Sequence, residues 1–149
     1  MATLSVTHTE AVTLNDREQG GTKTYTVASI ADVMKRTVAC TASQTTTVAV
    51  FNDTVHGAAG AIDAQNSKYI RVTNLDSSNS IELAIVGAAT LYQVKLAPGE
   101  SHVLGSADDL MLAEADTSPS FGTMADIASI QVNPGGNAVA VEVFVASTV

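Results

Sequence analysis

Short segments in which apolar and polar residues alternate dominate this chain of 149 residues. The clearest runs from Val139 to Val145, where valines occupy every second position. Because successive side chains of a strand point to opposite faces, this period of two indicates half-buried β-strands. Comparable segments, separated by turn-forming residues, cover 22–27, 45–51, 69–73, 81–85, 92–96, 101–104 and 127–132.

The number and spacing of these segments predict an all-β fold. About eight short strands separated by turn signals are typical of an antiparallel β-sandwich or barrel. We predict an antiparallel β-sandwich with a jelly-roll-like topology and at most one short helix. The only helical pattern covers residues 30–36, where a short connector helix and a continued strand are equally compatible with the sequence.

A chain of this length is expected to form one domain. We predict an N-terminal arm over residues 1–14 and a single β-sandwich domain over residues 15–149. A turn at Gly20-Gly21 should precede the strand at 22–27. The segment Asn74–Ser80 is rich in Asn, Asp and Ser, which satisfy turn backbone locally, and it predicts a β-hairpin that joins 69–73 to 81–85.

The charge balance argues against nucleic-acid and membrane partners. Seven Lys and Arg against fifteen Asp and Glu give a formal net charge of -8. The only adjacent bases are Lys35-Arg36, so no basic stripe can neutralise phosphates. Anionic lipids would repel this surface. Residues 1–13 lack a signal-peptide pattern and no apolar run reaches membrane length, so we expect a chain made inside the cell.

Few residues carry recognisable chemistry. His8, His56 and His102 lie far apart, which favours surface histidines over a metal site assembled from distant strands. The single cysteine, Cys40, lies in an alternating segment and is expected to be buried and inert. Residues 57–60 lack the Lys-Ser/Thr pair of a phosphate loop, and no nucleophile elbow is present. We expect no enzymatic activity, catalytic residues, cofactor or metal.

Two segments without assigned structure, 52–67 and 106–126, are candidate contact surfaces. The second is acidic, and Asp108, Asp109, Glu114 or Asp116 offers ligands for calcium. Solvated acids or a subunit contact are the favoured interpretation. Asn74–Asn79 also offers oxygen ligands, but a turn explains the same residues.

Small outward side chains are the remaining feature. Edge strands normally carry long charged residues that discourage association. A surface of small side chains loses little conformational entropy when it is buried, which favours assembly over a solitary sandwich. The outward positions that we expect to be small are Thr22, Thr24, Thr26, Thr45, Thr47, Ala138 and Ala140.

Three short segments, 69–76, 96–101 and 141–148, resemble small virion structural proteins of tailed bacteriophages, notably marine and cyanobacterial ones. The resemblance implies a capsid decoration or cement protein, located in the virion, that binds the major capsid protein or other virion proteins. It also implies a homo-oligomer, with a trimer favoured. A tail or head-to-tail connector component and a tail-borne receptor- or glycan-binding module are the alternatives. We expect the arm and the two long loops to supply the contacts.

Overall fold

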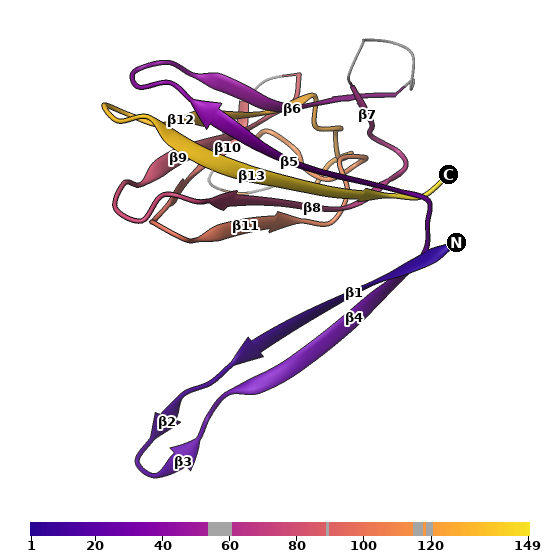
Figure 1. The fold of residues 1–149 in the computed structure, drawn as a ribbon. Coiled ribbons are helices and arrows are strands. Elements are labelled where there is room, and N and C mark those ends of the chain that lie inside the picture. Colours follow the sequence, from indigo (N-terminus) through magenta and orange to yellow (C-terminus); the bar gives the residue numbers. More distant parts are fainter. Residues whose placement is uncertain (54–60, 89, 115–117, 119–120) are drawn as a thin grey trace.

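The chain folds into two packed β-sheets from which a long β-hairpin projects (Figure 1). The computed structural model describes residues 1–53, 61–88, 90–114, 118 and 121–149. All helical or strand structure in these ranges is β, which confirms the predicted fold class. Within them, no helix is long and apolar enough to cross a membrane.

Each sheet of the sandwich combines strands that are distant in sequence. One has the order β10 (Thr90–Leu96), β9 (Ile81–Val86), β12 (Ser129–Asn133), β6 (Thr46–Asn52) and β7 (Ile62–Asp63). The other has the order β11 (Ser101–Leu104), β8 (Ser67–Asn74), β13 (Val139–Ser147) and β5 (Asp32–Cys40). Apart from the short β7, eight strands interleave between two antiparallel sheets, which is a jelly-roll arrangement.

The core lies between the inward faces of these sheets. The valines of β13 at 139, 141, 143 and 145 are at most 5% exposed, as the alternation predicts. Facing them from the other sheet are fully buried residues of β9 and β12 that belong to the same apolar cluster: Ile81, Leu83, Ile85, Ile130 and Val132. Burial of this apolar surface is the main stabilising term.

The ambiguous segment at 30–36 is not a helix: Ile30 ends one strand, β4 (Gly21–Ile30), and residues 32–36 begin the next, β5. β5 pairs with β13 without a break in register from Asp32 to Cys40. Met34 and Val38 pack against the core, and Cys40 is buried within it. A helix of one or two turns has little stability of its own, so pairing and burial decide in favour of the strand.

The predicted hairpin between 69–73 and 81–85 is wrong. β8 pairs with β11 and β13, whereas β9 pairs with β10 and β12, so the two segments lie in opposite sheets. Residues 75–80 therefore cross from one sheet to the other. The turn chemistry is present, but both strands have better partners elsewhere.

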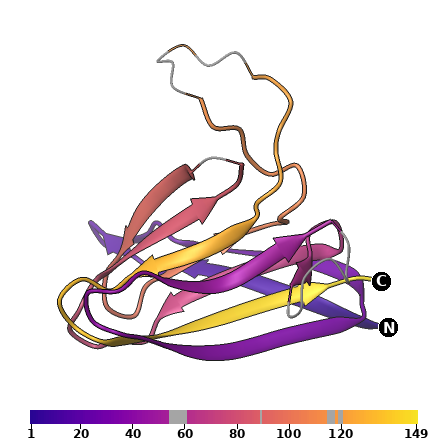
Figure 2. The ribbon, with the colours of Figure 1, turned by 90° about the horizontal axis from the view of Figure 1, so that it is seen from above.

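The arm is longer than residues 1–14. β1 (Ala2–Glu10) pairs with β4 (Gly21–Ile30), and β2 (Thr13–Leu14) pairs with β3 (Arg17–Glu18) at the tip. The strand predicted at 22–27 thus belongs to the arm, and the expected boundary after residue 14 falls at its tip. Viewed from above, the arm lies beneath the sheet of β5, β13, β8 and β11 (Figure 2).

The turn of the arm lies at Asn15-Asp16 and not at Gly20-Gly21. Both turn residues have positive φ, 52° and 59°, as a type I′ hairpin turn requires. Gly20 is needed for a different reason. A Cβ at this position would lie 1.9 Å from the carbonyl oxygen of Glu10, so any larger residue would push the two strands apart.

Candidate functional site

The arm is a two-faced ribbon, and one of its faces consists of Ser and Thr. Three successive cross-strand pairs form this face: Ser5 with Thr26, Thr7 with Thr24, and Thr9 with Thr22. The hydroxyls of the second and third pairs are 2.9 and 3.3 Å apart. All six side chains are exposed, so the expectation of small outward residues is confirmed at 22, 24 and 26. Thr45, Thr47 and Ala138 are also exposed, whereas Ala140 is half-buried.

The opposite face of the arm packs against the sandwich near its base, as far as the described residues show. Leu4, Val6 and Val27 pack there against the outer face of the sheet that contains β8 and β13. On the sheet, they pack against Tyr69, Val103, Phe144 and Ala146. Tyr69 is only 6% exposed although it points out of the sandwich, because the arm covers it.

A row of rings continues this contact along the arm. The Tyr69 ring meets Phe144 edge-on at 5.9 Å between centroids, and Tyr25 of the arm lies 6.5 Å from Tyr69. His8 stacks on Tyr25 at 6.1 Å with an interplanar angle of 14°. Such ring pairs add to the stabilisation from burial alone. The rings therefore fix the direction in which the arm leaves the sandwich.

Two cations flank the aromatic contact and share one carboxylate. Arg71 Nη2 lies 2.6 Å from Glu142 Oε1, and Lys35 Nζ lies 3.2 Å from Glu142 Oε2. The Arg71 guanidinium also lies over the Phe144 ring, 5.8 Å from its centroid. Two positive charges against one negative charge leave this patch locally cationic on a chain with a net charge of -8.

A groove of about 260 Å³ lies between the arm and the sheet. It extends the arm–sheet contact, because the apolar residues of that contact also line it. The lining comprises Leu4, Ser5, Val6, Thr7, Tyr69, Arg71 and Phe144. The groove thus combines apolar walls with a cationic guanidinium.

Beyond its base the arm is exposed on both faces. Residues 7–19 and 21–26 are all exposed, including Val12 at 51% and Leu14 at 61%. Glu18 shapes the tip by accepting hydrogen bonds from the backbone N–H groups of Gly20 at 2.8 Å and Val12 at 3.1 Å. These bonds lower the pKa of Glu18, so its carboxylate stays ionised. A two-stranded ribbon is marginally stable alone in water, so this part gains most from a partner.

Two features of the sequence indicate that the arm is a hairpin and not a single extended segment. Asn15-Asp16 between Leu14 and Arg17 is close to the dipeptides that form type I′ turns. The alternation of Thr7-His8-Thr9 also matches that of Thr22-Lys23-Thr24 across this turn. Read together, they predict the hairpin that the structure contains.

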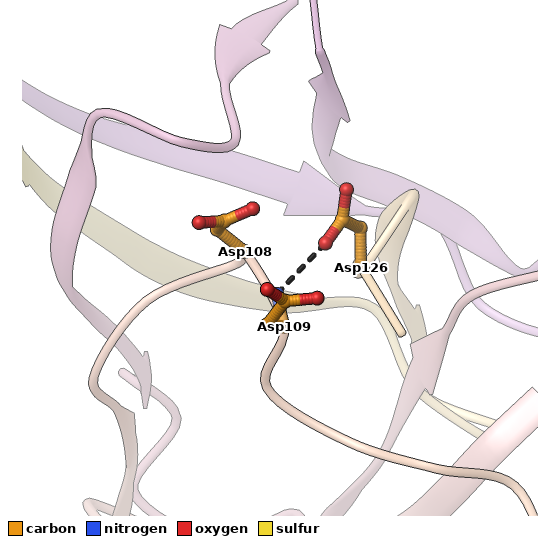
Figure 3. Close-up of side chains that lie close together, drawn as sticks. All are labelled: Asp108, Asp109 and Asp126. Atoms are coloured by element: carbon orange, nitrogen blue, oxygen red, sulfur yellow. Dashed lines mark hydrogen bonds between the residues drawn. The ribbon is translucent and has the colours of Figure 1, made fainter. Parts of the chain in front are cut away.

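The acidic segment brings three carboxylates together (Figure 3). Oxygens of Asp108, Asp109 and Asp126 lie within 4.8 Å of one another. The Asp109 backbone N–H donates a hydrogen bond to Asp126 Oδ1 at 2.7 Å. Burial first, and then the charges of Asp109 and Asp126, raise the pKa of Asp108. Calcium prefers six to eight oxygen ligands, and this group supplies part of such a set.

Of the four acids expected in this segment, the structure therefore groups only Asp108 and Asp109, with Asp126 as an unforeseen third. Glu114 lies exposed beside Phe121 and Met124 in an apolar pocket. Asp116 falls outside the described residues, as do His56 and residues 57–60. Whether the cluster acts as solvated acids, a subunit contact or a calcium site stays a prediction.

The remaining candidates have structural partners. The Asp76 carboxylate accepts hydrogen bonds from the backbone N–H groups of Ser78 and Asn79 and from the Asn79 side chain, which lowers the pKa of Asp76. This agrees with a turn. Cys40 is 1% exposed, and burial raises the pKa of its thiol, which keeps it protonated.

His102 joins the two sheets at one edge of the sandwich. Its Nε2 lies 2.5 Å from the Tyr92 hydroxyl, which comes from β10 in the opposite sheet. Burial lowers the pKa of His102, because the charged imidazolium loses solvation. The unfolded chain therefore binds a proton more readily than the folded chain as the pH falls through the ordinary histidine range.

We predict that acidification from pH 8 to pH 5 lowers the free energy of unfolding in part through His102. His102→Gln keeps a polar partner for Tyr92 but cannot titrate, so its stability should fall less over the same range. Urea denaturation at the two pH values measures the difference. His8→Gln on the exposed arm is the control. An equal fall in the wild type and in His102→Gln would refute the assignment.

No protein-family model matches the chain, and no curated protein sequence is significantly similar to it. A solved structure from work on Bacillus endospore appendages, described as a family of disulfide-linked pili, is similar over 78% of this chain and 89% of that chain. The identity is 8% and the TM-score is 0.41, values too low to support an argument about fold or function.

Proposed function

We propose that this chain is a non-enzymatic virion structural protein, a capsid decoration protein that binds the shell of the major capsid protein and stabilises it. The arm is the observation that carries the proposal. It projects from the sandwich and exposes both of its faces beyond the base (Figure 1). The resemblance of three sequence segments to virion proteins of tailed bacteriophages is the reason for proposing this class of protein.

The chemistry of the arm suits a docking element. Its Ser and Thr side chains have few rotatable bonds, so burying them against another protein loses little entropy. Its backbone edges can also accept a further strand. A shell presents many equivalent sites, so a modest contact per copy is sufficient when several copies or arms act together. The proposed location is the virion, and the proposed form is a homo-oligomer.

A short-arm variant tests the role of the arm. Replacing residues 11–20 by Asn-Gly should close the hairpin directly between Glu10 and Gly21, which pair in the native register. This change leaves the base of the arm in contact with Tyr69. We predict an unchanged circular dichroism spectrum and at least about tenfold weaker binding to purified capsids that lack the protein, which corresponds to about 1.4 kcal/mol.

The matched control is Leu75→Ala. Leu75 is an exposed apolar residue at 47% exposure, located in the segment that follows β8 and not in the arm. Its substitution should leave capsid binding unchanged. Full capsid occupancy by the short-arm variant would remove the arm from the proposal.

Cryo-EM of the assembled particle separates decoration from the alternatives. Copies spread over the shell support a decoration protein. Copies confined to one vertex would instead indicate a tail or connector component, or a receptor-binding module.

A further inference from the structure

The groove at the arm base has an apolar interior and a cationic rim. Leu4 and Val6 line it from the arm, and Tyr69 and Phe144 line it from the sheet. Arg71 lines the groove as well, and Lys35 is 63% exposed at its side chain beside the shared Glu142. The groove continues the surface that already binds the apolar face of the arm, so it suits a second segment of similar chemistry.

The arm tip has the complementary chemistry. Val12 and Leu14 are exposed apolar side chains. Residues 10–20 contain the acids Glu10, Asp16 and Glu18 and the single base Arg17, which gives the tip a net charge of -2. The apolar pair at the tip suits the apolar groove, and the negative charge of the tip is opposite to the positive charge of the rim.

We propose that the arm tip of one copy docks in the arm-base groove of a second copy. The tip of a chain cannot reach its own groove. Leu4 and Leu14 are ten residues apart along a paired ribbon, or about 33 Å at the rise of a β-strand. The occupant is therefore a second copy, with Val12 and Leu14 packed on the half-buried Val6 and Phe144 and the tip acids beside Arg71 and Lys35.

This contact joins two different surfaces, so it repeats from copy to copy until a ring closes or a filament forms. It also covers the part of the arm that is exposed on both faces. The inference does not rest on a role in the virion, because self-association is measurable with the purified chain alone.

Sedimentation over a range of chain concentrations tests the contact. The wild type should associate, and Leu14→Glu should weaken association at least tenfold, because it places a charge against the apolar groove walls. Leu75→Glu is the matched control at an exposed leucine outside the arm. A wild type that stays monomeric, or equal association of both variants, overturns the proposal.

Disulfide trapping tests the geometry independently. Ser5 lines the groove and is exposed, so a Ser5→Cys chain mixed with a Leu14→Cys chain should form disulfide-linked heterodimers under mild oxidation. The native Cys40 is buried and should not react. Ser5→Cys mixed with Leu75→Cys is the control. Equal yields in both mixtures would exclude tip-to-groove docking, whereas failure of capsid binding alone would leave it intact.

Discussion

Asn74→Ala is expected to lower the free energy of unfolding by about 3 kcal/mol, because it removes the hydrogen bonds by which a buried side-chain amide joins three backbone groups. The Asn74 side chain is fully buried. Its Nδ2 donates hydrogen bonds to the carbonyl oxygens of Asn79 at 2.8 Å and Ala97 at 3.2 Å, and its Oδ1 accepts one from the Asp76 N–H at 3.1 Å. One amide thus holds the crossing between the sheets to the turn that follows β10.

Urea denaturation of Asn74→Ala measures this loss. Asn133→Ala is the control, because both hydrogen bonds of the Asn133 amide are solvent-exposed: it donates to Glu82 Oε2 at 2.9 Å and accepts from the Gly135 N–H at 3.0 Å. An exposed substitution of this kind should change stability by no more than about 0.5 kcal/mol. Equal effects at the two positions would show that the buried amide is dispensable.

The role of Asn74 explains why the sequence predicts a hairpin between 69–73 and 81–85 that the structure does not contain. Asn, Asp and Ser after β8 correctly predict a turn, because their side chains bond to nearby backbone. Local bonds do not determine which strands pair across the turn. The pattern places Asn74 in a turn, but its side chain is buried and bonds to the segment after β10, a contact 23 residues away that no local pattern contains.

The strand positions were predictable because the alternation depends on burial of one face. All eight predicted segments overlap strands, and Ser101–Leu104 has the predicted limits. The first strand of the arm was missed because its alternation serves a ribbon that is exposed over most of its length. Periodicity indicates that a segment is extended, but it does not indicate whether the partner is a sheet or another strand of the same arm.

The composition of the acidic cluster was likewise only partly predictable from the sequence. Asp108 and Asp109 are adjacent, so the sequence predicts their proximity. Asp126 joins them only because β-bridge pairing between Met111 and Ala125 brings the two ends of the segment together. A single sequence does not reveal this pairing.

The base of the arm should depend on Tyr69 above other residues. Tyr69→Ala removes the ring that contacts both Tyr25 of the arm and Phe144 of the sheet. Removal of a buried aromatic ring costs about 3–5 kcal/mol in a closed core. Only part of this stabilisation comes from the contact between the arm and the sheet. We therefore expect the free energy required to open the arm to decrease by about 2 kcal/mol. Amide hydrogen exchange in β1 and β4 should then accelerate about 30-fold.

The matched control is Tyr25→Ala, since Tyr25 is a tyrosine of the same ring row at 41% exposure. Its loss should accelerate arm exchange only a few-fold, because solvent already surrounds much of the ring. Amides of β12 report on the core and should respond less to Tyr69→Ala than those of the arm. Equal acceleration in β12 and β1 would mean that Tyr69 supports the whole sandwich. The arm would then be held by the aliphatic contacts of Leu4, Val6 and Val27 instead of by the rings.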